Sequence, residues 1–211
     1  MSAAPIIEDW KRRLVAMADH PPYVFRDTHR SLIDEHHRRL TTFTGFPRAE
    51  VGEVESRLGV RFPAVFREFL LQMAKSPGAL FAGSDLAGLQ DLDRFQADAL
   101  ELLRETDPSL SLPPAAVVFL IHQGYAFLYV LAVGGFDGPP MQWTEMAPEP
   151  RPVAATFAEM VDAELRLMED NDRKFRDQGG YWLTLLPGGG ATQSHPALAS
   201  GERPLDQVHR E

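Results

Sequence analysis

The chain has 211 residues, enough for one well-packed core with additional segments. Hydrophobic residues make up 44% and charged residues 24%, as in ordinary soluble proteins, and the longest apolar run is too short to cross a bilayer. No cysteine is present, which excludes a disulfide frame and thiolate chemistry, and the N-terminus does not have the pattern of a signal peptide. We therefore expect a cytoplasmic protein that does not bind membranes.

The formal net charge of −9 is distributed unevenly along the chain. Residues 1–48 carry eight Lys/Arg and six Asp/Glu, whereas the remaining residues carry 13 and 24. The acidic part has no basic cluster to bind phosphates, so we expect no direct contact with nucleic acid. Such a charge would attract a basic protein partner, although many proteins are this acidic only for solubility.

Two amphipathic helices are predicted before residue 48. Apolar residues recur at helical spacing over residues 7–17, and again from about Thr28 to Leu40, with Asp27 or Thr28 as a possible cap. The second helix carries His29, His36 and His37. No two of these histidines are four residues apart and there is no H-E-x-x-H motif, so we expect a solvated helix face and no metal site. We interpret residues 1–48 as a helical extension packed on the core.

Residues 51–73 predict two short helices joined by a fixed corner. The first helix ends at Leu58, and Gly59 follows where a left-handed closing residue is needed. Pro63 holds the preceding residue extended and suits the first turn of a new helix. The apolar face of that second helix comprises Val65, Phe66, Phe69, Leu70 and Met73.

The second helix of this corner lacks an obvious N-terminal cap. Phe62 stands at the N-cap position and has no side-chain oxygen to accept from the first backbone N–H groups. We predict that Glu55, one turn before the end of the first helix, supplies the missing acceptor.

The middle of the chain predicts a loop, a helix and a β-hairpin. A Gly-containing loop over residues 79–89 precedes a helix that Asp91 is expected to cap. Strands are predicted at 116–122 and 125–133, joined by a tight turn at Gln123 and Gly124. Both strands are apolar on both faces, so either both faces are covered or one meets a second copy in a homodimer. We interpret His122 as an exposed hairpin end, because no catalytic partner is close to it in sequence.

A third strand, over residues 141–146, is where we expect a partner to bind. Trp143 is a candidate interface anchor because its neighbours are polar, and Glu145 and the preceding Phe136 and Asp137 are expected to lie close by. The alternative is that Trp143 belongs to the core.

The C-terminal third predicts one helix and a strand. Thr156 and Glu159 form a capping box before an apolar stripe that runs to Met168. Residues 169–186 are expected to continue the helix and then, at 181–186, to add a strand or dock on the core. Residues 187–211 are Gly-rich, and we expect a poorly ordered tail there.

An ordered set of these motifs resembles the SMI1/KNR4 superfamily, also called SUKH, over residues 49–168. The residues that carry the resemblance are Glu55, Leu58, Gly59, Phe62, Pro63, Phe66, Phe69 and Leu70, then Gly124, Phe136, Asp137, Thr156 and Phe157. The chain departs from the family pattern at Phe66, where Tyr is usual, and at Ser76, Pro77 and Gly78, where Asn-Gly is usual.

The resemblance implies an α+β fold in which an antiparallel sheet packs with helices. It also implies a non-enzymatic, cofactor-free binding protein, either an immunity protein that neutralises a bacterial toxin, often a nuclease, or a signalling adaptor. The acidic charge favours a basic toxin domain as the partner. A hydrolase is disfavoured because the sequence has neither a nucleophile elbow nor a triad motif.

Overall fold

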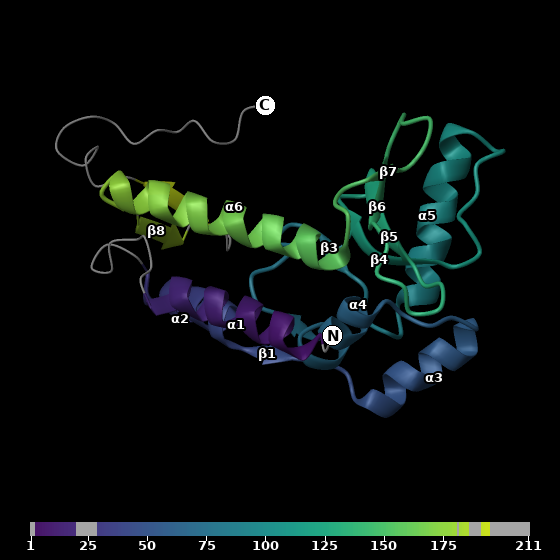
Figure 1. Ribbon diagram of the computed structural model, residues 1–211. Coiled ribbons are helices and arrows are strands. Elements are labelled where there is room, and N and C mark those ends of the chain that lie inside the picture. The colour runs from purple at the N-terminus through teal and green to yellow at the C-terminus, as the bar shows by residue number, and fades with distance from the viewer. Residues whose placement is uncertain (1–2, 20–28, 181, 186–190, 195–211) are drawn as a thin grey trace.

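The computed structural model describes residues 3–19, 29–180, 182–185 and 191–194, and its fold is α+β, as predicted (Figure 1). The helices are α1 (Ala4–Asp19), α2 (Arg30–Thr41), α3 (Arg48–Leu58), α4 (Ala64–Gln72), α5 (Leu92–Thr106) and α6 (Phe157–Asp177). The strands are β1 (Phe43–Thr44), β2 (Ser76–Pro77), β3 (Asp85–Leu86), β4 (Ala116–His122), β5 (Ala126–Leu131), β6 (Met141–Thr144), β7 (Arg151–Pro152), β8 (Trp182–Leu185) and β9 (Ala191–Ser194).

Strands β3 to β7 form an antiparallel sheet in sequence order, and its two long central strands are the predicted hairpin. The turn between β4 and β5 is closed by a 3.2 Å hydrogen bond from the Tyr125 N–H to the His122 carbonyl, and its central residues Gln123 and Gly124 have positive φ angles (47° and 78°). Helix α5 packs on β4, and β4 is buried from Ala116 to Ile121. The chain itself therefore covers this strand, which accounts for its apolar character on both faces.

An aromatic cluster joins the sheet to the helices. Phe157 at the start of α6 has its ring centroid 5.1 Å from that of Phe66 and 5.5 Å from that of Phe69, both on α4. Phe119 of β4 packs against Phe66 and Phe157 at 5.5 and 5.6 Å. Edge-to-face contacts at such distances add to the stability gained by burying the rings. The predicted apolar face of α4 is thus the centre of the core.

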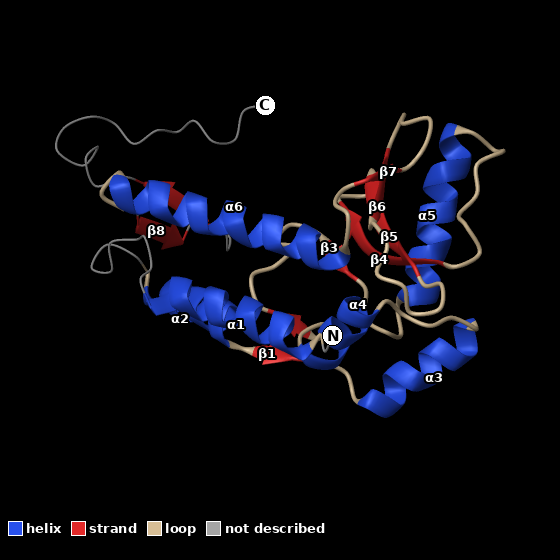
Figure 2. Cartoon of the chain, viewed as in Figure 1, coloured by secondary structure: helices blue, strands red, loops and turns tan. Residues whose placement is uncertain are grey.

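Helix α1 lies in the core rather than at its margin. It contacts α2, α4 and α6, and its side chains Ile7, Trp10 and Leu14 are fully buried. Figure 2 shows α1, α2 and α6 on one side of the molecule, with the sheet and α5 on the other. Asp27 and Thr28, proposed as caps of the second helix, lie outside the described residues.

The corner between α3 and α4 forms largely as expected. Gly59 closes α3 with a φ of 65°, and the carboxylate of Glu55 accepts a 3.0 Å hydrogen bond from the backbone N–H of Phe62. Its second oxygen accepts from Arg67, one turn into α4, at 3.0 Å. Glu55 therefore holds the entry to α4, but through the residue before Pro63 rather than through the first helical N–H groups.

The structure differs from two predictions, one at the start of α5 and one near the C-terminus. Asp91 makes no capping hydrogen bond to α5, because it has helical dihedral angles itself. Strand β8 forms where a strand or docked segment was predicted, but it pairs only with β9, in a separate two-stranded sheet. Residues 191–194 are consequently a strand, although the sequence predicted a poorly ordered tail there, because β8 offers them an edge to pair with.

Candidate functional site

Trp143, the predicted interface anchor, is a core residue. Its side chain is 0% exposed and its ring stacks on Phe127 at 5.4 Å between centroids. The indole N–H donates a 3.1 Å hydrogen bond to the carbonyl of Ala147. Of the two interpretations that the sequence allowed, the structure supports the core alternative, because a fully covered ring offers no surface to a partner.

The other three predicted binding residues do not come together. Phe136 is 70% exposed in the loop before β6, whereas Glu145 is exposed immediately after that strand. The two therefore lie at opposite ends of β6. A four-residue strand alone separates its ends by about 10 Å.

Asp137 is turned toward α4. Burial raises the pKa of the Asp137 carboxyl, and a hydrogen bond from the backbone N–H of Val65, in the first turn of α4, opposes this only in part. One carboxylate oxygen is buried without a partner among the described residues. Asp137 therefore faces the start of α4 and is not available as an exposed charge.

The strand register brings a different set of residues together at the other end of the sheet. His122 of β4 pairs with Ala126 of β5, which pairs with Thr144 of β6, so the three strand ends lie in one row. Just beyond this row, the backbone N–H of Glu145 donates a 2.7 Å hydrogen bond to the carbonyl of Tyr125. Tyr125 is 39% exposed and Met146 is 81% exposed.

We call this end of the sheet the hairpin-end surface. It consists of Tyr125, Glu145 and Met146, with the exposed acids Asp85 beside β4 and Glu149 in the β6–β7 loop.

The turn that carries Met146 is held in a constrained conformation. Met146 has a φ of 66°, which is uncommon for a residue other than glycine. A 2.9 Å hydrogen bond from the Ala147 N–H to the Thr144 carbonyl closes the turn, and the buried Trp143 binds the Ala147 carbonyl. Non-glycine residues keep such dihedral angles only where their surroundings fix them, and this occurs often at functional sites.

A serine–histidine contact lies beneath the same surface. The Ser84 hydroxyl is 2.8 Å from Nδ1 of His122, whose ring meets the Tyr125 ring edge-on at 5.3 Å. Sequence spacing could not reveal the pair because 38 residues separate its members. Within the described ranges, no carboxylate hydrogen-bonds to His122 and no group of three or more His, Asp or Glu side chains could hold a metal. The contact orients the imidazole without completing a triad.

The charge of the molecule is concentrated around the sheet. Residues 76–150 contain ten Asp/Glu and two Lys/Arg, and no Lys or Arg occurs between Arg104 and Arg151. Both of the basic residues lie on α5. Asp85, Glu145 and Glu149 have no ion-pair partner in the part of the chain that the structure describes. Their charges are therefore available to an external partner.

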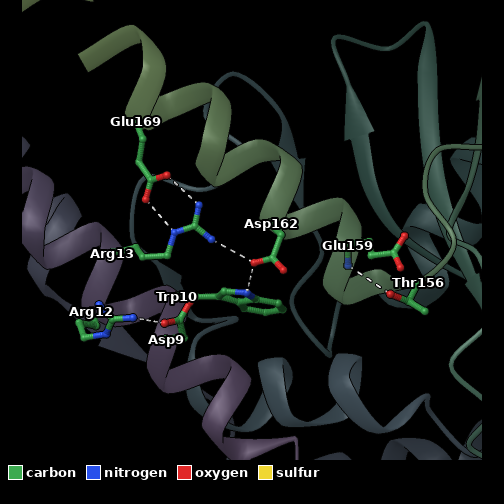
Figure 3. Close-up of polar contacts among 8 residues, drawn as sticks. All are labelled: Asp9, Trp10, Arg12, Arg13, Thr156, Glu159, Asp162 and Glu169. Atoms are coloured by element: carbon green, nitrogen blue, oxygen red, sulfur yellow. Dashed lines mark hydrogen bonds and ion pairs between the residues drawn. The ribbon is translucent and has the colours of Figure 1, made fainter. Parts of the chain in front are cut away.

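The carboxylates between α1 and α6 are, by contrast, neutralised inside the chain (Figure 3). Arg13 donates two hydrogen bonds to Glu169, at 2.7 and 2.8 Å, and a third to Asp162 at 3.1 Å. Asp162 also accepts from the indole N–H of Trp10 at 3.0 Å. The hydrogen bond with Arg13 lowers the pKa of Glu169, and the same bond raises the pKa of Arg13. We call these four residues the α1–α6 seam.

These features define an α+β protein in which helices pack against an antiparallel sheet, and one end of that sheet carries exposed acidic residues. The sequence profile of the SMI1/KNR4 family (SUKH-1) matches residues 45–163, slightly more than half of the chain. The chain belongs to this family, as the motifs in its sequence indicated. A search of curated proteins finds no match.

The matched region ends inside α6 and excludes α1, so Arg13, Trp10 and Glu169 of the α1–α6 seam lie outside the family match. Among the helices that the structure describes, none is long and apolar enough to cross a membrane.

Proposed function

We propose that the protein is a non-enzymatic immunity protein that binds and neutralises a basic toxin domain, such as a nuclease, in the cytoplasm. The observation that carries the proposal is the uncompensated acidic charge of residues 76–150, which lie inside the region matched by the family. A nuclease must present basic side chains to phosphates. An acidic protein of this kind is attracted to such a surface and competes with nucleic acid for it.

The mechanism would be occlusion of the toxin's active surface. A stable protein complex typically buries about 800 Å² on each partner, enough to cover a nuclease cleft. Electrostatic attraction raises the association rate, while well-packed apolar contacts slow dissociation. The proposal requires no chemical change in the toxin.

The closeness of Ser84 and His122 makes an enzymatic mechanism worth testing directly. An immunity protein that acts by binding inhibits in proportion to its amount, so toxin activity should fall linearly to zero at a one-to-one ratio. The toxin recovered by denaturation should have its original intact mass. Loss of activity at much lower ratios, or a changed toxin mass, would instead indicate catalysis.

The experiment tests the product of the gene next to this one, which the proposal expects to carry a toxin domain. Co-expression of the full chain should allow cells to survive expression of that domain, and the two proteins should co-purify as a complex. Survival without complex formation would contradict neutralisation by binding. A stable complex that leaves toxin activity intact would contradict immunity and favour the adaptor alternative.

A further inference from the structure

We infer that the hairpin-end surface is the docking surface for the basic partner, with Tyr125 and Met146 as the central contacts. This inference rests on the proposed function and specifies where the chain performs it. The surface combines exposed large side chains, unpaired carboxylates and a constrained backbone at one end of the sheet.

The two central side chains suit an interface core. Tyr is enriched at the energetic centres of interfaces, since its ring contributes much contact area and its hydroxyl a hydrogen bond. Met is flexible and polarisable, so it fits pockets of irregular shape. Met146 is the most exposed large hydrophobic residue among those described, and the 2.7 Å bond between Glu145 and Tyr125 joins the two turns that carry these side chains.

The surrounding charges specify a basic partner. Asp85, Glu145 and Glu149 are all exposed and acidic, and no Lys or Arg follows Arg104 before Arg151. Lys and Arg side chains of a partner would find carboxylates that form no ion pair with any described residue of the chain. A second copy of this chain would instead bring like charges together, which disfavours self-association through this surface.

The surface is also preorganised, because buried groups fix its backbone. Trp143 holds the carbonyl of Ala147 beside Met146, and Ser84 holds the ring of His122 against Tyr125. Binding to a fixed surface loses less conformational entropy than binding to a flexible one. Trp143 therefore holds the backbone of the proposed interface in position. The sequence had instead suggested that Trp143 contacts the partner directly.

Other exposed apolar side chains lack this combination. Leu167, 55% exposed on α6, lies in a helix whose carboxylates are largely engaged in ion pairs. Phe136 stands beside Asp137, whose carboxylate is turned toward α4. Leu167 therefore provides a matched control for Met146, and the exposed Glu53 on α3 provides one for Glu145.

The test measures binding of the full chain to the adjacent gene's toxin domain, inactivated by mutation, using biolayer interferometry. Tyr125→Ala combined with Met146→Ala should weaken binding at least tenfold, mainly through faster dissociation. Glu145→Lys should slow association severalfold at low salt, and the difference should shrink as salt rises. Leu167→Ala and Glu53→Lys should bind like the wild type, and all variants should keep the thermal midpoint of the parent.

The possible failures are distinguishable. If the wild type does not bind the toxin domain, the proposed function fails in the stated form, and this inference fails with it. If the wild type binds and the hairpin-end variants bind equally well, the surface assignment is overturned while the function stands. If these variants change only the protein's own oligomeric state, a second copy occupies the surface and the basic partner does not.

Discussion

The α1–α6 seam and the hairpin-end surface place the same kind of side chain in opposite circumstances. At the seam, Asp162 and Glu169 accept hydrogen bonds from Arg13 and Trp10, and the pKa of Glu169 is lowered. At the sheet end, Glu145 is exposed and no described residue pairs with it. The chain neutralises its charges where two helices must stay together and leaves them unpaired where the proposed partner binds.

This difference separates stability from recognition. Exposed, unpaired carboxylates contribute little to folding. The proposed function gives their concentration on one part of the surface a role in binding. The carboxylates of the α1–α6 seam hold α1 against α6. They thereby attach α1 to the rest of the fold, although α1 lies outside the family match. Substitutions in the two regions should therefore affect different measurements.

The largest expected effect is on stability, from Trp143→Ala. Removing this fully buried ring should lower the free energy of unfolding by about 3–5 kcal/mol, measured by urea denaturation. Trp143→Phe should lower it much less, since it keeps a ring against Phe127 but loses the hydrogen bond to Ala147. If Trp143→Ala unfolded with nearly the same midpoint as the wild type, the core assignment would be wrong.

Arg13→Ala should have the next largest effect, about 1–3 kcal/mol, because it removes charged hydrogen bonds from a partly solvated site. The effect should depend on pH. With its pKa lowered in the folded state, Glu169 stabilises the fold above its unfolded pKa, and that contribution is lost as pH falls through the folded pKa. Arg13→Ala should therefore make the acid side of the stability curve shallower. The pH dependence of stability in Glu169→Gln should be shallower on the acid side in the same way. If the losses of stability in Arg13→Ala and Glu169→Gln simply added in the double variant, a direct interaction between the two residues would be contradicted.

A smaller effect is expected from Glu55→Ala at the α3–α4 corner. The loss of its bonds to Phe62 and Arg67 should cost about 0.5–2 kcal/mol, in the range of other capping groups. Affinity for the toxin domain should stay within a factor of two, because the corner is outside the hairpin-end surface. An unchanged urea midpoint would show that the carboxylate does not hold the entry to α4.

The smallest effect should come from Asp137→Asn, within about 1 kcal/mol at neutral pH. The amide oxygen can still accept from Val65, and the cost of burying a charge disappears. Since the pKa of Asp137 is raised in the folded state, wild-type stability should decline as pH rises from the ordinary Asp pKa through the raised one. Thermal midpoints across this interval should decline less in the variant, and an identical slope in both proteins would exclude Asp137 as the cause.

Local patterns predicted most elements of the fold. The apolar periodicity of α1, α4 and α6, the Gly59 stop and the capping box at Thr156 all act within a few residues of the chain, and each appears in the structure. The Glu159 N–H donates to the Thr156 hydroxyl at 3.2 Å, as the capping box requires. Such signals need no knowledge of the tertiary arrangement.

The candidate site was harder to predict, because it depends on strand register and long-range contacts. The contrast of Trp143 with its polar neighbours favoured an edge, yet β7 continues the sheet beyond β6 and the ring packs on Phe127. The closeness of Ser84 to His122 and that of Arg13 to Glu169 follow from the packing of distant segments, which spacing in one sequence cannot show. The absence of Lys and Arg from 105 to 150 was the signal of the proposed docking surface that could be read in the sequence.

Hydrogen exchange of the full chain, free and bound to the inactivated toxin domain, tests the central claim most directly. The proposed contrast predicts added protection on binding at the backbone amides of residues 122–128 and 144–149. Exchange along α1 should stay unchanged, because the α1–α6 seam is already satisfied within the chain. Protection confined to α1 and α6, with the two sheet-end segments unaffected, would contradict the account.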